Sequence, residues 1–356
     1  MSRKRDGSPG AFSPGRKGNF MTLDGKTVLI TGGTGSFGKK FTEVVFQKFK
    51  PKKVIIFSRD EFKQFMMSKT FPAEKYPIRY FIGDIRDSVR LFRAFEGVDY
   101  VVHAAALKQV PAAEYNPFEA VKTNVLGAQN IVEAALDRGV KKVIALSTDK
   151  AVSPINLYGA TKLAMEKLIV AANSYVGAHD ILFSVVRYGN VVGSRGSVIP
   201  LFLKLIKEGK KELPVTDERM TRFWITLEEG ANLVLTALEE SVGGEIFVPK
   251  IPSMKITDLA KALCPKCRYK VVGIRPGEKI HESLISEDEG RSTVAIQKNG
   301  KRIYVILPQY FFETKNRQKY LSAEKLPDGF SFHSDTNDSW LTVPELKELI
   351  KDVQPE

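Results

Sequence analysis

From Thr27 onward, short runs of β-branched residues alternate with longer stretches of helical periodicity, and this alternation restricts the fold more than any other feature. We predict strands at 27–31, 54–58, 78–82, 100–104, 142–146 and 181–187, and helices that include 38–49 and 116–138. Strands that alternate with helices build βαβ units on a parallel sheet. Six of them in succession indicate an α/β fold with a doubly wound parallel sheet.

The regular pattern loosens after Arg187, where glycines and prolines interrupt shorter elements. We therefore predict a main domain over residues 25–190, with a return segment near 226–248. A smaller C-terminal lobe, formed by 191–225 and 249–350, would close over a ligand crevice. Residues 1–24 form a basic tail rich in Gly, Ser and Pro, which we expect to be disordered.

The composition excludes several classes of protein. A chain of 356 residues that is 43% hydrophobic and 27% charged can bury a large core, so most of it is not intrinsically disordered. No apolar run approaches the roughly 20 residues that cross a bilayer, and the first twenty residues hold no signal-peptide core. We therefore expect a soluble, cytoplasmic protein without a membrane partner.

The formal net charge of +13 permits an anionic partner. The first twenty residues hold five basic residues and one acidic residue, and the remaining excess is spread over the rest of the chain without a basic helix. Nucleic acid is therefore not an expected partner.

The two cysteines, Cys264 and Cys267, are too few for a disulfide framework. A lone Cys-x-x-Cys also lacks the second pair of ligands that a structural zinc site requires. We predict a loop turn at this position and no metal site.

A glycine-rich turn joins the first strand to the next helix. Residues 31–38 read TGGTGSFG, which satisfies both the G-x-x-G-x-x-G and the G-x-G-x-x-G pattern. Glycines allow a tight turn and let backbone N–H groups approach a pyrophosphate at the positive end of a helix. Because the turn follows a strand and opens a helix, we predict a Rossmann dinucleotide site that uses Gly32, Gly35, Ser36, Phe37 and Gly38.

The end of the second strand decides between the two nicotinamide dinucleotides. Ser58 and Arg59 stand where an NAD enzyme keeps an acid for the ribose hydroxyl, and an arginine there favours the 2′-phosphate of NADP. Asp60 leaves NAD open as the less favoured cofactor. We expect five further residues to line the cofactor site, with Asp84 at the adenine: Asp84, Ile85, Ala104, Ala105 and Lys108.

A polar cluster follows the fifth strand, at the sheet edge where ligands of doubly wound folds bind. Tyr158 and Lys162 are four residues apart and share one face of a helix. A nearby ammonium and an oxidised nicotinamide favour the phenolate, so Tyr158 can accept a proton from a substrate hydroxyl while hydride leaves for the cofactor. Lys162 would lower the pKa of Tyr158 and hold the nicotinamide ribose, and Thr148 would bind the reacting hydroxyl. This trio resembles that of the extended short-chain dehydrogenase/reductase (SDR) superfamily.

Asp149 and Lys150 narrow the chemistry further, because simple dehydrogenases and 4-epimerases of that superfamily usually have small neutral residues there. Oxidation at carbon 4 of a sugar acidifies the proton at carbon 5. An acid and a base at carbons 6 and 5 could then eliminate water, and hydride returned to carbon 6 would regenerate the cofactor. An exposed Asp-Lys pair in a loop is the structural alternative.

Taken together, these motifs resemble the inverting UDP-N-acetylglucosamine 4,6-dehydratases, over residues 25–349. The segments that carry the resemblance are 31–38, 58–61, 83–84, 103–108, 147–150, 158–162, 187–196, 220–224 and 275–279. The resemblance implies an NADP-dependent lyase that makes UDP-2-acetamido-2,6-dideoxy-β-L-arabino-hex-4-ulose, the first intermediate of pseudaminic acid biosynthesis. It also implies a homo-oligomer.

The same resemblance implies roles for individual residues. Tyr158 would be the base at the carbon 4 hydroxyl, Asp149 the acid that expels the carbon 6 hydroxyl, and Lys150 the base at carbon 5. The catalytic set is then Thr148, Asp149, Lys150, Tyr158 and Lys162, and the residues expected to bind UDP-N-acetylglucosamine are Lys108, Asn190, Arg222, Arg275 and Glu278. Arg222 and Arg275 could instead be surface ion-pair residues.

Two other functions stay open on these residues. A UDP-hexose 4-epimerase shares Thr148, Tyr158 and Lys162, and Lys150 discriminates it from a dehydratase. A non-catalytic, NADP-responsive binding protein is the second alternative, and the intact catalytic trio argues against it.

Overall fold

The computed structural model of the protein describes residues 22–193, 197–310, 318–351 and 353. The predicted disordered tail therefore lies outside the described residues except for 22–24, of which Leu23 is buried in the main core.

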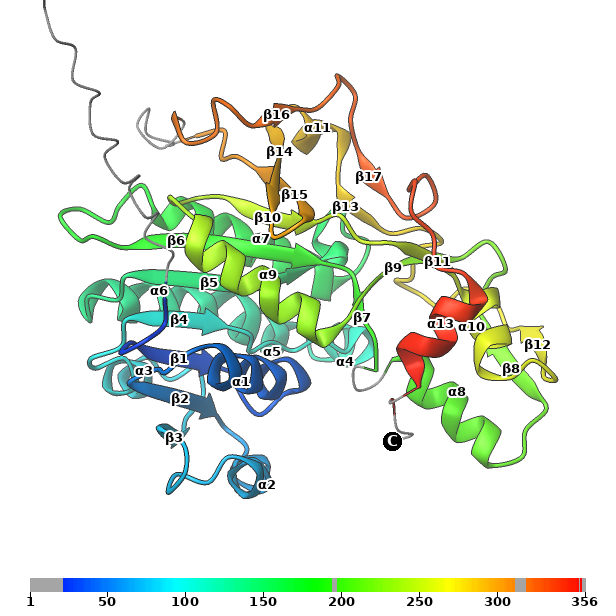
Figure 1. The fold of residues 1–356 in the computed structure, drawn as a ribbon, viewed down its shortest axis with the longest axis horizontal. Helices are drawn as coiled ribbons and strands as arrows, with labels where there is room; N and C mark the ends of the chain where they lie inside the picture. Colours follow the sequence, from blue (N-terminus) through cyan, green and yellow to red (C-terminus); the bar gives the residue numbers. More distant parts are fainter. Residues whose placement is uncertain (1–21, 194–196, 311–317, 352, 354–356) are drawn as a thin grey trace, which may run out of the picture.

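A ten-stranded sheet forms the centre of the molecule (Figure 1). Seven of its strands are parallel: β1 (Thr27–Thr31), β2 (Lys53–Ser58), β3 (Ile78–Ile82), β4 (Tyr100–His103), β5 (Lys142–Thr148), β6 (Leu182–Tyr188) and β10 (Ile246–Pro249). Their order in the sheet is β10-β6-β5-β4-β1-β2-β3. From β1 the chain adds β2 and β3 toward one edge, and from β4 it adds the later strands toward the other edge, so the order reverses between β1 and β4. Such a reversal opens a ligand crevice at the carboxyl ends of the strands. The predicted doubly wound α/β fold is confirmed.

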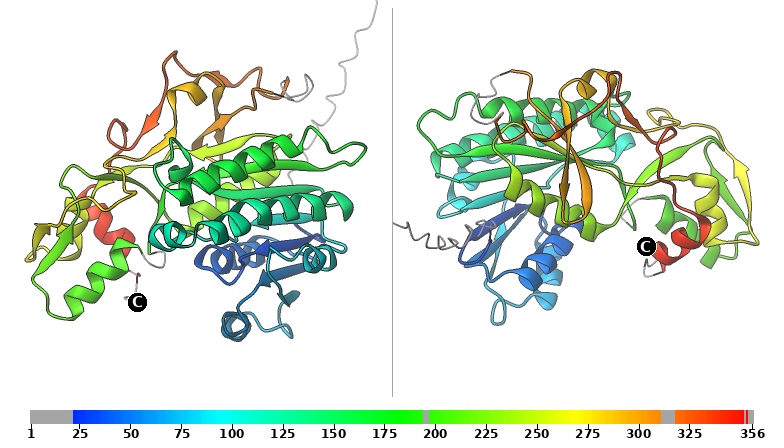
Figure 2. Two further views of the ribbon diagram at one scale, coloured as in Figure 1. Left: turned by 180° about the vertical axis from the view of Figure 1, so that it is seen from behind. Right: turned by 45° about the horizontal axis from the view of Figure 1, so that its top comes forward.

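Helices cover both faces of the sheet, as the apolar runs of its strands require. Helices α1 (Ser36–Lys48) and α9 (Leu227–Glu240) pack together on one face. Helices α3 (Ser88–Ala94), α6 (Gly127–Asp137) and α7 (Leu157–Ala172) pack on the opposite face, which is turned forward in the left view of Figure 2. Helix α2 (Glu61–Thr70) lies beside β2 and the edge strand β3.

The helix predicted over 116–138 is divided in the structure. It contains α5 (Pro117–Val121), a π-helical turn η1 (Lys122–Leu126) and α6, and α4 (Val110–Tyr115) precedes them. The π turn carries the buried Asn124, whose amide accepts from Leu107 N and donates to Leu107 O and to Thr161 Oγ1. Asn124 thereby ties the loop after β4 to helix α7.

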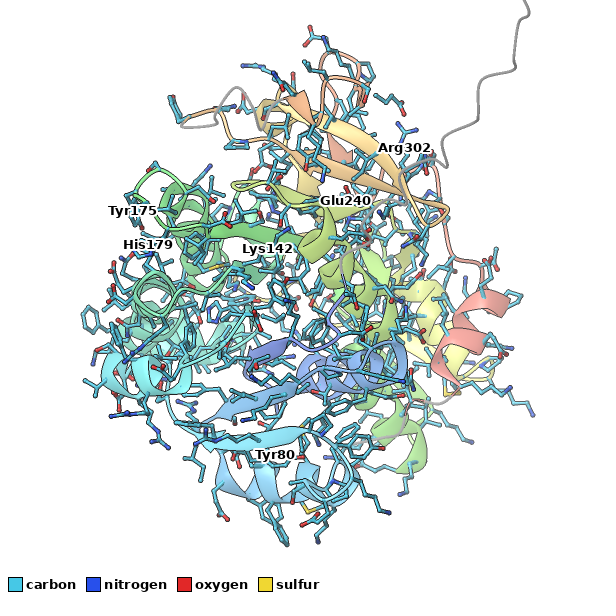
Figure 3. The ribbon with its side chains drawn as sticks, turned by 60° about the vertical axis from the view of Figure 1, so that its left-hand side comes forward. Tyr80, Lys142, Tyr175, His179, Glu240 and Arg302 are labelled. Atoms are coloured by element: carbon cyan, nitrogen blue, oxygen red, sulfur yellow. A yellow bond between two sulfur atoms is a disulfide. The ribbon has the colours of Figure 1, made fainter. Side chains whose placement is uncertain are left out.

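The return segment consists of α9 and β10. Lys142, at the start of β5, donates to Leu238 O and Ser241 O at the end of α9. Figure 3 labels Lys142 beside Glu240, the last residue of that helix. These bonds satisfy carbonyl groups at the helix end that have no partner within the helix.

A second, smaller core lies beyond the sheet. It packs α8 (Val198–Lys207), β8 (Glu212–Val215), β9 (Thr221–Ile225), β11 (Ser253–Lys255), α10 (Ile256–Leu263), β12 (Arg268–Val271) and α13 (Val343–Ile350). The strand β7 (Asn190–Val191) pairs with β9.

The segment 249–350, which the sequence assigns to one lobe, is shared between the two parts. Strands β15 (Lys301–Ile306), β14 (Thr293–Lys298) and β16 (Glu324–Lys325) extend the main sheet in antiparallel fashion. The remaining elements are β13 (Ser283–Ile285), which pairs with β17 (Phe332–His333), and the short helix α11 (Glu287–Gly290). Ala295 and the run Ile303–Ile306 of these strands are buried in the main core, which explains why this segment joins the main sheet.

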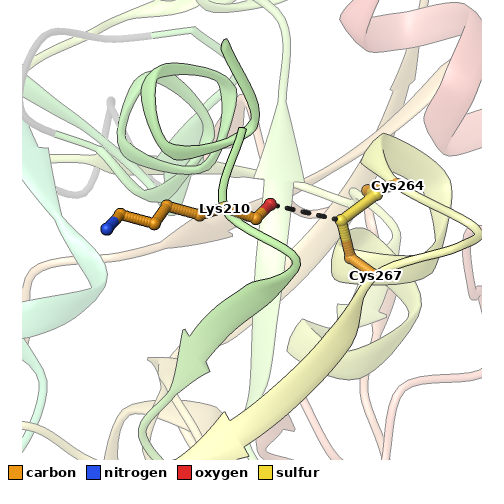
Figure 4. The surroundings of a disulfide bond; sticks show 3 residues. All are labelled: Lys210, Cys264 and Cys267. Carbon is orange, nitrogen blue, oxygen red and sulfur yellow. Dashed lines mark hydrogen bonds between the residues drawn. A yellow bond between two sulfur atoms is a disulfide. The ribbon is translucent and has the colours of Figure 1, made fainter. Parts of the chain in front are cut away.

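The cysteine pair differs from the predicted plain turn, because Cys264 and Cys267 form a disulfide (Figure 4). The Sγ atom of Cys267 lies 3.8 Å from the carbonyl oxygen of Lys210. The bond closes the turn between α10 and β12. Among the described residues there is no group of three or more His, Cys, Asp and Glu side chains suited to a metal ion. The described helices also include none of the length and apolar character that spanning a membrane requires.

Candidate active site

A cavity of about 610 Å³ opens at the carboxyl ends of the parallel strands, over the point where the strand order reverses. Every residue predicted to bind the cofactor lines it, and so do the predicted catalytic residues Thr148, Asp149, Lys150, Tyr158 and Lys162. The structure therefore brings together in one space two groups of residues that are far apart in the sequence.

The glycine-rich turn is shaped for a close approach of backbone to a ligand. Gly32 has a φ of +66°, and a Cβ atom on it would lie 2.8 Å from the Ala105 backbone nitrogen. A Cβ on Gly38 would lie 2.4 Å from Gly33 Cα, so α1 can pack against the turn only with glycine there. The cap residue Gly35 offers no side-chain hydrogen bond, and the first turn of α1 has no acidic residue. This helix end fits the pyrophosphate of a dinucleotide.

Two charged residues lie beyond the end of β2. The Arg59 side chain is 60% exposed, and its Nη1 atom lies 3.7 Å from Asp84 Oδ2. Asp60 caps α2 by accepting from Lys63 N at 2.9 Å, and it also pairs with Lys63 Nζ at 2.7 Å. Arg59 thus has room to turn toward a ligand, whereas the Asp60 carboxylate is already engaged by its own helix.

Thr148, Asp149 and Lys150 form a compact polar group where β5 ends in the short helix η2 (Asp149–Ala151). Thr148 Oγ1 donates to Asp149 Oδ1 at 2.8 Å, and Lys150 Nζ lies 3.0 Å from the same oxygen. Burial by itself would lower the pKa of Lys150, but the carboxylates of Asp149 and Glu282 outweigh it, so that pKa is raised. The resting group therefore contains an ammonium at Lys150.

Tyr158 lies in the first turn of α7. Burial raises the pKa of Tyr158 to about 12, although the Lys150 charge and a hydrogen bond with Thr148 oppose the rise. Lys162 Nζ donates to Leu146 O at 2.6 Å, and burial lowers the pKa of Lys162 to about 8 in spite of Glu166. The charge of Lys150 thus lowers the pKa of Tyr158 in this structure, and the role of Lys162 at the nicotinamide ribose stays a prediction.

The comparisons with known proteins agree with this site. A model of the polysaccharide biosynthesis protein family matches residues 28–304. A UDP-N-acetylglucosamine 4,6-dehydratase (inverting) from Campylobacter jejuni is 56% identical over 330 residues, which are 91% of this chain and 97% of that protein. The chain belongs to the family of inverting UDP-N-acetylglucosamine 4,6-dehydratases. The resemblance inferred from the motifs is confirmed.

Two further proteins are similar to this member of the dehydratase family. The solved structure of Pen from Bacillus thuringiensis has a TM-score of 0.83 and 39% identity, covering 93% of this chain and 100% of that one. A UDP-glucose 4-epimerase from Rickettsia massiliae is 43% identical over 336 residues, 91% of this chain and 95% of that protein. Identity to the epimerase is thus clearly lower than identity to the dehydratase.

All of the predicted cofactor-binding residues line the cavity, but only some of the predicted substrate-binding residues do. Lys108 and Asn190 line the cavity, whereas Arg222, Arg275 and Glu278 are outside its lining. Arg275 is 64% exposed, with Nε 3.5 Å from Glu278 Oε1. Both stand on the loop between β12 and β13, next to Gly277.

Arg222, on β9, is buried, so it is not a surface ion-pair residue. Its guanidinium donates to Thr221 O, Ile280 O and Lys279 O. In this structure it therefore fixes the backbone of the loop that carries Arg275 and Glu278.

Two residues of the site have no counterpart in the sequence prediction. Asn156 caps α7 by accepting from Gly159 N at 2.8 Å, and its Nδ2 donates to Gly277 O at 2.9 Å. Glu282 is 2% exposed, and its Oε1 lies 3.3 Å from Lys150 Nζ. The cap could have been recognised from an Asn before a helical run, but no local pattern marks Glu282.

His103 is a buried polar residue that connects two strands of the main sheet. Its Nδ1 shares a hydrogen bond of 2.8 Å with Thr31 Oγ1. Burial, together with the charge of Lys162, lowers the pKa of His103 to about 3, so the ring is neutral. It joins β4 to β1 beneath the cavity.

Proposed function

We propose that the protein converts UDP-N-acetylglucosamine into UDP-2-acetamido-2,6-dideoxy-β-L-arabino-hex-4-ulose, by 4,6-dehydration with inversion at carbon 5. The observation that carries this proposal is the ion pair between Asp149 and Lys150, which lines the cavity beside Tyr158. A 4-epimerase has no use for an acid and an amine at this place, whereas an elimination across carbons 5 and 6 requires both.

The cavity has residues suited to a nicotinamide dinucleotide, and we propose NADP, which when bound would supply the hydride acceptor and donor for carbons 4 and 6. The uncapped helix end at Ser36–Gly38 would bind the pyrophosphate. Arg59 would bind the 2′-phosphate, because its guanidinium is largely exposed at the cavity while Asp60 is occupied as a helix cap. Lys162 would hold the nicotinamide ribose.

In the first step, Tyr158 would accept the proton of the carbon 4 hydroxyl. Burial disfavours the phenolate in the empty cavity, whereas the Lys150 ammonium and the hydrogen bond with Thr148 favour it, and the positive charge of a bound oxidised nicotinamide would favour it further. Thr148, which lines the cavity, would hydrogen-bond the reacting hydroxyl. Oxidation at carbon 4 then acidifies the proton at carbon 5.

The elimination starts from a Lys150 ammonium, so Lys150 must lose a proton before it can act as a base. Asp149 Oδ1, 3.0 Å from Nζ, is placed to accept that proton. The resulting amine would take the proton from carbon 5, and the Asp149 carboxylic acid would protonate the carbon 6 hydroxyl, which leaves as water. This step restores the ammonium and the carboxylate, so the pair returns to its resting charges. Inversion requires that carbon 5 then be reprotonated from the opposite face.

The product would be the first intermediate of pseudaminic acid biosynthesis, and we propose a homo-oligomer as the working form. The exposed side chains of Tyr115 (88%) and Phe118 (64%), on the adjacent helices α4 and α5, support an apolar contact between subunits. Size-exclusion chromatography with light scattering tests the assembly, and a monomeric mass would contradict it.

The function is tested by incubating the purified protein with UDP-N-acetylglucosamine in deuterated water and following the mixture by proton NMR. A carbon 6 methyl signal, deuterium at carbon 5 and L-arabino couplings are the expected result. A 4-epimer without a methyl signal would replace the proposal with the epimerase. No reaction, with cofactor bound, would favour the non-catalytic binding protein.

A further inference from the structure

Glu282 belongs to the C-terminal part of the chain, and its carboxylate forms a second ion pair with the Lys150 ammonium beside that of Asp149. It stands just before β13, 132 positions after Lys150 in the chain. Its Oε1 lies 3.3 Å from Lys150 Nζ and 3.8 Å from Arg222 Nε. Lys150 Nζ therefore lies within 4 Å of two carboxylates, those of Asp149 and Glu282.

We propose that Glu282 is a positioning residue of the reaction, which holds the Lys150 amine at the cavity wall and keeps a proton on the Asp149–Lys150 pair. The proposal rests on the proposed function and assigns to it a residue beyond the cavity lining. Glu282 would act through Lys150 without touching the substrate.

Glu282 is buried although burying a carboxylate is costly, which indicates that its charge serves a function. Only 2% of the residue is exposed, and its Oε2 has no hydrogen-bond partner among the described residues. A buried carboxylate with an unsatisfied oxygen is costly, and an apolar side chain would fill the same volume without that cost. The charges that offset this cost are those of Lys150 and Arg222, so the position is suited to placing a cation and poorly suited to packing alone.

The charge state of Lys150 depends on several charged groups around it. Asp149 and Glu282 stabilise the ammonium, Arg222 and burial oppose it, and Tyr158 and Lys279 are close enough to interact electrostatically with the group. Without Glu282, only the Asp149 carboxylate would stabilise the Lys150 ammonium, while Arg222 and burial would still destabilise it. The neutral amine would then form at lower pH, and Nζ would lose one of its two anchors.

The position of Glu282 also links the Lys150 amine to the loop that carries Arg275 and Glu278. Arg222 donates to Lys279 O and Ile280 O, so it fixes the backbone immediately before Glu282. The Glu282 backbone N–H donates to Ser334 Oγ at 2.9 Å. These bonds fix the backbone at and just before Glu282, from which its carboxylate reaches Lys150.

The test is the rate at which Lys150 itself is acetylated by trace acetic anhydride, read by peptide mass spectrometry over a range of pH. Only the neutral amine reacts, so the rate reports its fraction at this one residue. At a pH below the midpoint of its titration, Glu282→Gln should raise the Lys150 rate by about tenfold or more, because an opposite charge within 4–6 Å shifts a pKa by about 1–3 units. Glu282→Asp should fall between wild type and Glu282→Gln. The matched control is Glu287→Gln, which removes the same charge from an exposed position of the same segment and should change nothing.

Steady-state kinetics of the same variants form the second part of the test. We expect Glu282→Gln to lower kcat about tenfold or more with little change in KM, because the amine is displaced while the cavity lining is unchanged. A Lys150 labelling rate equal to that of wild type in a folded Glu282→Gln variant would overturn the proposal. If that variant does not fold, an unchanged labelling rate and kcat in Glu282→Asp would do so. Failure of wild type to form the methyl product would count against the proposed function alone, since labelling of Lys150 requires no substrate.

Discussion

The side-chain amide of Asn156 donates a 2.9 Å hydrogen bond to the carbonyl oxygen of Gly277, although 121 positions separate the two residues. Asn156 is also the N-cap of α7, the helix that carries Tyr158 and Lys162. One side chain therefore starts the catalytic helix and anchors the loop of Arg275 and Glu278.

These two roles can be separated by substitution. Asn156→Asp keeps the oxygen that accepts from Gly159 N but cannot donate to Gly277, so we expect a higher KM for the UDP-sugar at nearly unchanged Tm. Asn156→Ala loses both contacts and should also lose about 1 kcal/mol of stability. Thermal unfolding and steady-state kinetics measure the two effects. Equal KM values for wild type and Asn156→Asp would contradict an anchoring role.

Arg59 is expected to set the choice of cofactor. Arg59→Ala should lower the affinity for NADP relative to NAD by about tenfold or more, because a charge-assisted hydrogen bond to a phosphate is lost. Titration of the apoprotein with each cofactor gives the ratio. Arg79→Ala, which removes an exposed arginine outside the cavity, is the control. An unchanged ratio in Arg59→Ala would remove the argument for NADP.

Lys150 distinguishes dehydration from oxidation alone. Lys150→Ala should reduce formation of the methyl product by at least about 100-fold, because the base at carbon 5 is lost, while bound cofactor can still be reduced by the sugar. Absorbance of the reduced nicotinamide and NMR of the product follow the two steps. Lys167→Ala, an exposed lysine on the same helix as Tyr158, should retain activity. Normal turnover by Lys150→Ala would refute the role given to this amine.

Lys162 should make stability depend on pH in a defined direction. Burial lowers its pKa from 10.5 to about 8 in the folded chain, so between these values the unfolded chain binds more protons and stability rises with pH. The penalty of burying the ammonium is fully present below pH 8. Relative to Lys162→Met, which has no ionisable group there, the free energy of unfolding of wild type should increase by up to about 3 kcal/mol from pH 8 to 10.5. Urea unfolding of both apoproteins checks this, and a constant difference across that range would show that Lys162 does not titrate as stated.

The features that were predicted correctly are those encoded over a few neighbouring residues. The strands at 27–31 and 78–82 have the predicted bounds: the first is a fully buried run rich in β-branched residues, and the second combines buried Ile78 and Phe81 with more exposed positions. The glycine turn and the Tyr158–Lys162 pair are likewise contiguous or one helical turn apart, and both lie where expected.

Features that depend on the distance between remote segments became visible only in the folded chain. The pattern of residues along the chain was enough to predict the doubly wound fold, the cofactor site and an acid and an amine after β5. That pattern could not show that Lys150 lies close enough to Tyr158 to lower its pKa, that Arg222 binds the loop backbone, or that Glu282 lies beside the amine. Electrostatic effects and hydrogen bonds depend on separations of a few ångströms, and only the folded chain brings residues from β9 and the segment before β13 to that distance from β5.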